Sequence, residues 1–340
     1  MARRSLVAGA AAVAAAGVLA ESSSAVASAS DRLVDVHAHF VPSVYLRRAK
    51  ALGASPDGMP DWPSWSEAGH LALMDLAGID VSVLSLSSPG VHLGTGAEAV
   101  SLARAVNDEA AAVVRRHPGR FRFLASLPLP DVAAAVAEWR RVRGTPGCVG
   151  VIVLSHSAGR YPGDASFEPL WKELDAAGAM VLLHPTSPPH WESVSGGRPR
   201  PLIEFSFETA RACLDLFEAS TVGRHRGIRW VVTHCGGALP IVLDRILTFG
   251  LGGLTISPLS TMSQLGRLWF DTAGSPFPTE VPALLQHVGA ERMVYGSDYC
   301  FTPAVGVAAQ LASVATAAAA PSGEPWRRVM ARNGRRLLGP

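Results

Sequence analysis

The chain has 340 residues, of which 48% are hydrophobic and 17% are charged, and its formal net charge is +2. This length suits a single α/β barrel of roughly 250 residues or more, and the composition predicts a large buried core and excludes a disordered chain. The basic residues are mostly scattered arginines without a basic stripe, which argues against a nucleic-acid partner.

Residues 1–29 are expected to be an export signal and not part of the fold. Arg3 and Arg4 precede a mildly hydrophobic, alanine-rich run from Leu6 to Ala20, and a small-x-small cleavage pattern ends at Ala27. The run is shorter than the about 20 residues that a membrane span needs. The arginine pair favours the twin-arginine route, which predicts an exported protein without a membrane span in the mature chain. A frayed helix is the alternative interpretation.

Residues 30–340 contain eight short apolar runs that alternate with helical stretches. Such runs are typical of parallel strands that are buried on both faces. The expected strands are Leu33–Val36, Val81–Leu86, Phe121–Ser126, Val149–Leu154, Met180–Leu183, Ile228–Val232, Leu268–Phe270 and Met293–Tyr295. Eight β/α units predict a single-domain (β/α)₈ TIM barrel. An open doubly wound sheet is the alternative, but no Gly-x-Gly-x-x-Gly follows the first strand.

Helices are expected between the strands and after the last one, at Glu67–Ala77, Ala97–His117, Val132–Val142, Phe167–Ala177, Pro303–Ala320 and Trp326–Leu338. Two segments rich in proline and glycine, Gly53–Ser66 and Ser187–Pro201, interrupt this pattern. They are interpreted either as substrate loops at the mouth of a barrel or as ordinary surface loops.

Polar residues stand where four of the expected strands end. His37 and His39 close the first strand, and strand alternation places both imidazoles on one face. His184, His234 and Asp298 follow the fifth, sixth and eighth strands. A lone histidine at a strand end is more often a core residue. Five such side chains, however, converge at the carboxyl ends of barrel strands, and together they predict a metal site.

The sequence resembles the amidohydrolase superfamily, in particular its metal-dependent decarboxylases of aminocarboxymuconate semialdehyde, γ-resorcylate and 6-methylsalicylate. The resemblance covers roughly residues 33–338. It rests on His37-Ala38-His39, His184-Pro185, His234-Cys235-Gly236-Gly237 and Gly296-Ser297-Asp298-Tyr299. Other stretches, such as 84–92 and 126–131, look most like the 6-methylsalicylate decarboxylase group.

The resemblance implies that His37, His39, His184 and Asp298 bind the metal, and that His234 is the catalytic histidine beside it. Two-metal relatives bridge their ions through a lysine or glutamate on a middle strand. The run Val149–Leu154 contains neither, so one divalent ion is expected. Imidazole ligands favour zinc, whereas the carboxylate also tolerates manganese. The resemblance further implies a homodimer.

The substrate is expected to be a small carboxylic acid, because three imidazoles and one carboxylate leave a divalent ion with a net positive charge. Arg211 could bind the substrate carboxylate, although a surface position is an equally good interpretation. Trp62, Phe205 and Phe301 could line an aromatic pocket or simply fill the core.

The preferred reaction is non-oxidative decarboxylation of an ortho-hydroxylated aromatic or muconate-like acid, with Asp298 or His234 as proton donor. A metal-dependent hydrolase, lactonase or hydratase of the same superfamily branch is the alternative. There the ion would lower the pKa of a bound water and His234 would act as the base. An inactive metal-binding or scaffolding protein is disfavoured, since it would have no need to keep the five polar residues in register.

Overall fold

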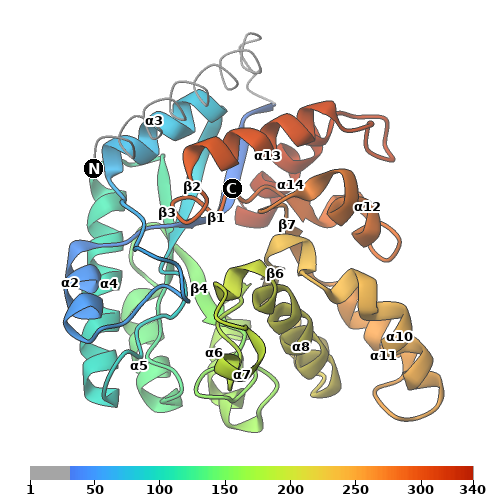
Figure 1. The fold of residues 1–340 in the computed structure, drawn as a ribbon, viewed down its shortest axis with the longest axis horizontal. Helices are drawn as coiled ribbons and strands as arrows, with labels where there is room; N and C mark the ends of the chain where they lie inside the picture. Colours follow the sequence, from blue (N-terminus) through green and yellow to red (C-terminus); the bar gives the residue numbers. More distant parts are fainter. Residues whose placement is uncertain (1–30, 340) are drawn as a thin grey trace.

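The computed structural model describes residues 31–339, and its centre is one parallel sheet of eight strands in sequence order (Figure 1). The strands are β1 (Leu33–His39), β2 (Ile79–Ser85), β3 (Phe121–Ala125), β4 (Cys148–Leu154), β5 (Met180–His184), β6 (Arg229–Val232), β7 (Trp269–Asp271) and β8 (Met293–Val294). The amide of Val36 donates to the carbonyl of Tyr295 at 3.0 Å, which joins β1 to the segment after β8. The expected TIM barrel is therefore confirmed. The expected signal, residues 1–29, lies outside the described residues.

Helices surround this sheet (Figure 1). They are α2 (Ser43–Ala51), α3 (Glu67–Ala77), α4 (Gly96–Arg116), α5 (Val132–Val142), α6 (Glu168–Ala176), α7 (Trp191–Val194), α8 (Glu204–Glu218), α9 (Thr221–Arg224), α10 (Leu239–Leu251), α11 (Pro258–Leu265), α12 (Val281–Leu284), α13 (Ala304–Thr316) and α14 (Trp326–Leu338). The expected helices at 67–77, 132–142 and 326–338 have the same bounds in the structure. Within residues 31–339, no helix is both long and apolar enough to cross a membrane.

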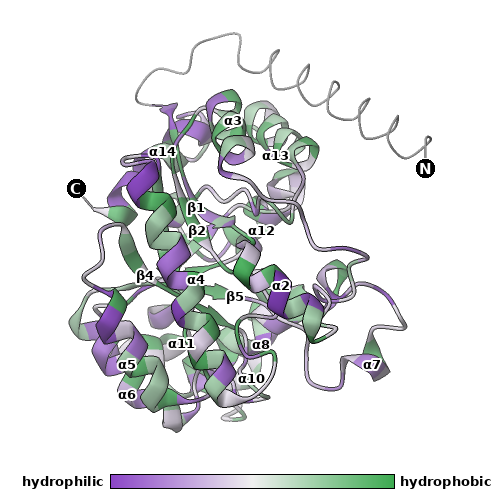
Figure 2. Cartoon of the chain, turned by 90° about the vertical axis from the view of Figure 1, so that its left-hand side faces the viewer, coloured by the Kyte–Doolittle hydropathy of each residue, from purple (hydrophilic) through white to green (hydrophobic). Residues whose placement is uncertain are grey.

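The core has two layers, one between the strands and the helices and one inside the barrel. The inner layer contains Val34, Val36, Leu182 and Val294, and Leu337 of α14 packs against it. The helix α14 contacts both β1 and β8, and its Leu337 packs in the inner layer with Val34 and Met180, at the starts of β1 and β5. The end of α14 therefore lies at the end of the barrel opposite the polar residues. Figure 2 shows hydrophobic strands inside a shell of helices with hydrophilic outer faces.

A β-bulge in β1 decides which way the first two histidines point. Val34 and Val36 line the barrel interior, so strict alternation would send His37 and His39 to the outer face. Between Asp35 and Ala38, however, β1 advances by three residues while β2 advances by two. The extra residue reverses the alternation and turns both imidazoles inward. The two histidines share a face, as the sequence predicted, and the bulge makes that face the inner one.

The two proline-rich loops are joined to each other. The backbone amide of Arg200 donates to the carbonyl of Asp57 at 3.1 Å, and the Nε of Arg200 donates to the Ser187 hydroxyl at 2.9 Å. The Arg200 guanidinium lies 3.9 Å from the centre of the Trp191 ring, a cation–π contact. Figure 2 shows that α7 and its neighbouring loops stand out from the barrel.

Candidate metal centre

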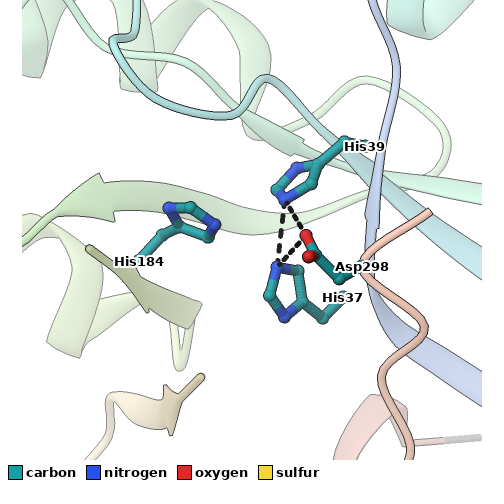
Figure 3. A group of neighbouring side chains, drawn as sticks. All are labelled: His37, His39, His184 and Asp298. Carbon is teal, nitrogen blue, oxygen red and sulfur yellow. Dashed lines mark hydrogen bonds and ion pairs between the residues drawn. The ribbon is translucent and has the colours of Figure 1, made fainter. Parts of the chain in front are cut away.

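Four side chains meet at the mouth of the barrel. One ligand atom each from His37, His39, His184 and Asp298 lies within 4.8 Å of all the others. The Nε2 atoms of His37 and His39 are 3.0 Å apart, and Asp298 Oδ1 lies 3.5 Å and 3.1 Å from them. Figure 3 shows His184 facing this group from across the site. The structure therefore brings together all four residues that the resemblance implied as ligands.

Each of the three imidazoles is held through its Nδ1 atom. His37 Nδ1 donates to Asp271 Oδ2 at 2.9 Å, and His184 Nδ1 donates to the carbonyl of Pro185 at 2.7 Å. His39 Nδ1 is 3.0 Å from the hydroxyl oxygen of Ser85, whose own proton goes to the carbonyl of Ala38. With the proton on Nδ1, the lone pair of every Nε2 atom is available to a shared ion.

Asp271 is a site residue that the sequence analysis missed. It is fully buried at the end of β7, and besides His37 it accepts the backbone amides of His234 at 2.9 Å and Ala273 at 3.0 Å. Burial alone would lower the pKa of His37, but the charge and the hydrogen bond of Asp271 raise it. Asp271 thus connects the expected metal ligand His37 to the expected catalytic residue His234.

The charge of Asp298 is well supported. Burial alone would raise the pKa of this carboxyl, but the neighbouring imidazoles of His234 and His39 hold it well below its usual range. Burial lowers the pKa of His39, and it lowers the pKa of His184 much further. The site therefore combines one carboxylate with imidazoles, of which burial favours the neutral form in His39 and His184, and this is a suitable donor set for a divalent transition metal.

The chain needs an unusual backbone to place His234. Residues 234–237 all have positive φ values, between 52° and 83°. The last two are Gly236 and Gly237, and this left-handed region costs glycine little. His234 Nδ1 lies 3.0 Å from Thr233 Oγ1, while Nε2 lies 3.8 Å from Asp298 Oδ2. His234 therefore stands beside the four-residue group, with 24% of its side chain exposed.

The expected substrate residues divide into two sets. Phe301 and Phe205 adjoin the metal centre, with ring centres 5.4 Å from His39 and 6.2 Å from His184, respectively. Arg211 is 53% exposed and donates to the buried Glu208 at 2.7 Å. Trp62 packs edge-on against Tyr45, with ring centres 5.4 Å apart. The structure thus groups the two phenylalanines with the metal centre but gives Arg211 and Trp62 partners elsewhere.

A metal-binding group at the carboxyl ends of parallel strands, with polar residues beside it, defines a barrel metalloenzyme. Comparison with known proteins identifies the family within this class. The chain belongs to the amidohydrolase family, whose sequence profile matches residues 34–339. The resemblance deduced from the sequence motifs is confirmed.

Several similar proteins are named as decarboxylases. The decarboxylase yanB of Aspergillus niger is 33% identical over 289 residues, which cover 79% of this chain and 77% of that protein. A 6-methylsalicylic acid decarboxylase of Penicillium expansum is 30% identical over 283 residues, covering 79% and 85% of the two chains. These relatives agree with the expectation of a carboxy-lyase.

Solved structures show the same fold. An amidohydrolase II crystal structure superposes with a TM-score of 0.83 at 31% identity, covering 90% of this chain and 99% of that one. A 5-carboxyvanillate decarboxylase of Novosphingobium aromaticivorans, crystallised with manganese, has a TM-score of 0.77 at 23% identity, covering 91% and 97%. At this lower identity the likeness extends to the fold alone.

Proposed function

We propose that this chain is a metal-dependent, non-oxidative decarboxylase of an ortho-hydroxylated aromatic acid or a muconate-like acid. The observation that carries the proposal is the common orientation of His37, His39 and His184. Each keeps its proton on Nδ1 and leaves Nε2 for an ion that Asp298 also reaches. The decarboxylase relatives support the choice of reaction.

The geometry of three members of the group fits one divalent ion, and the ligand atom of the fourth, His184, lies within 4.8 Å of the others. Tetrahedral ligands at about 2.1 Å from a metal lie about 3.4 Å from one another. The separations among His37, His39 and Asp298 are 3.0, 3.1 and 3.5 Å. When bound, a zinc or manganese ion would supply the positive charge that holds the substrate's carboxylate and ortho hydroxyl. A structural neighbour was crystallised with manganese, so zinc and manganese are both candidates for this ion.

The remaining chemistry is assigned to the residues around the group. Phe205 and Phe301 flank the imidazoles and suit a planar ring. The Thr233 hydroxyl donates to the carbonyl of Leu183, so it accepts from Nδ1 of His234. A protonated His234 therefore carries its second proton on Nε2, toward the group. That proton would add to the ring carbon that bears the carboxylate. The bond to the carboxylate then breaks, CO₂ leaves and the ring regains aromaticity. Asp298, as a ligand, is the less suitable donor.

The test is turnover of a panel of hydroxybenzoates, muconate-like acids and lactones in D₂O by the metal-loaded protein. A decarboxylase releases CO₂ and places one deuterium on the carbon that carried the carboxylate. A hydrolase or hydratase would incorporate solvent oxygen and release no gas. Lactone turnover without CO₂ from any acid of the panel would replace the proposed reaction by hydrolysis and leave the metal centre in place.

We also propose that residues 1–29 direct export by the twin-arginine route, because Arg3 and Arg4 precede the mild apolar run. Replacing both arginines by lysine should leave the precursor in the cytoplasm, as measured by fractionation and immunoblotting. Unchanged export of the double variant would contradict this route. The homodimer implied by the family resemblance stays a prediction, and light scattering of the purified protein tests it.

A further inference from the structure

A cavity of about 210 Å³ lies beside the metal centre, on the side of strands β2 to β5. We call it the side cavity, and its walls include Leu86, Ser126, Ile152, Leu154 and Thr186. None of the four grouped residues lines it.

Three residues of its lining lie next to residues of the metal centre, along the chain or across a strand pair. Leu154 pairs in register with His184, and Thr186 follows His184 by two residues. Leu86 follows Ser85, whose hydroxyl holds His39. The group draws its residues from β1, β5 and the segment after β8, so β2, β3 and β4 leave this side of the mouth to other occupants.

The titratable side chains in the walls of the side cavity are those of His92 and His156. Within the described chain, its lining contains no aspartate, glutamate, lysine or arginine. Most of the lining is aliphatic, His156 already bonds the carbonyl of Ser187 and the amide of Gly159, and His92 is exposed. A charged group buried among the aliphatic side chains would therefore lose its hydration without gaining a partner. The hydroxyl oxygen of Ser126 is buried and has no hydrogen-bond partner among residues 31–339. A ligand in the cavity would therefore meet a largely apolar surface that includes one buried hydroxyl oxygen without a partner.

We propose that the side cavity binds the substituted edge of the substrate ring and so selects monocarboxylic acids with an uncharged substituent. This inference rests on the proposed function for the identity of the acid. An apolar cavity of about 150 Å³ can hold a benzene molecule, so the side cavity has room for a ring edge with a small alkyl group. Ser126 supplies one hydrogen bond to a hydroxyl or carbonyl on that edge.

Calorimetric binding to the metal-loaded protein tests the proposal without relying on turnover. The ligands are salicylate and salicylates with a methyl, ethyl, carboxylate or hydroxyl group at each open ring position in turn. At one position, each added methylene should tighten binding about fourfold, the ratio for burial of one such group. A carboxylate at that position should weaken binding at least a hundredfold.

Leu154→Phe narrows the side cavity at a half-buried residue outside the metal group, and Leu251→Phe, at an exposed leucine of α10, is the matched control. Leu154→Phe should abolish the gain in affinity from the ethyl group while leaving the affinity for salicylate within twofold of the wild type. Leu154→Ala should raise the affinity for the derivative with the larger substituent. The control should match the wild type. Equal effects of Leu154→Phe on salicylate and on the ethyl derivative would overturn the proposal.

Ser126→Ala separates the polar contribution. This substitution should weaken binding of the hydroxyl-substituted ligand about fivefold and leave binding of the methyl derivative unchanged. Unchanged binding of both ligands would remove Ser126 from the proposal. If the selectivity appears but no acid releases CO₂, then the proposed reaction is wrong and the side cavity stands. If CO₂ is released without the selectivity, the side cavity assignment is wrong and the reaction stands.

Discussion

Asp271→Asn is the most informative single substitution at the metal centre. The asparagine oxygen can still accept the backbone amides of His234 and Ala273, and the side-chain volume hardly changes. The amide nitrogen, however, would face His37 Nδ1, where a proton now points. His37 must then move its proton to Nε2, the atom that faces the ion, so the variant should fold but hold metal poorly.

Loss of a partner that orients a metal-bound histidine typically weakens metal affinity about 10- to 100-fold. This corresponds to about 1.4 to 2.7 kcal/mol in the free energy of metal binding. The assay is competition for Zn²⁺ and Mn²⁺ against a chelating dye, with circular dichroism to check the fold. Asp244→Asn, at a carboxylate whose side chain is 85% exposed, is the matched control and should bind like the wild type. Wild-type affinity in folded Asp271→Asn would refute the assignment of the His37 proton.

Three further outcomes are expected. His234→Ala should retain the metal, by elemental analysis, but lose about 10²- to 10⁴-fold in rate, and loss of the metal would make His234 a ligand. Gly296→Ala would place a Cβ 2.8 Å from His37 Cβ and 3.0 Å from Asp271 Cβ, so unfolding in urea should show a loss of about 1–3 kcal/mol, and an unchanged midpoint would exclude this crowding. Burial lowers the pKa of His70 to about 3, so its contribution to stability is complete above the unfolded value near 6.5 and is lost as the pH falls. Between pH 7 and 4.5 the wild type should lose about 2.7 kcal/mol more than His70→Gln, and parallel losses would contradict a neutral His70.

The sequence was sufficient to predict the eight strands and the four residues that the structure groups together. Strands buried on both faces leave continuous apolar runs, and polar residues directly after such runs stand out. Asp271 follows the seventh run in the same manner as Asp298 follows the eighth. The rule that found Asp298 therefore applied to Asp271 as well, because Asp271 directly follows the expected run Leu268–Phe270. Its role depends on the contact with His37 from a distant strand, which the local pattern does not record.

The positions of the substrate residues were harder to predict from the sequence. Arg211 lies on a helix after a long loop, and its direction depends on Glu208, which offers a buried carboxylate one helical turn away. The contact between Trp62 and Tyr45 likewise depends on how a loop folds back over α2. Such contacts are set by tertiary packing, which a local pattern does not record. Phe205 and Phe301, by contrast, are close in sequence or in space to grouped residues.

The bulge in β1 gives the first strand two neighbouring side chains on the same face. Below it, Val34 and Val36 keep the phase of the barrel interior, and above it the two histidines keep the phase of the mouth. Val36 and His37 are consecutive, yet both face the barrel interior, because the extra residue of the bulge lies between Asp35 and Ala38. Deleting Val36 would restore strict alternation with Val34, His37 and His39 still facing inward, and would remove only the apolar side chain next to the ligands. The bulge therefore lets one strand contribute consecutive side chains to the apolar interior and to the metal centre.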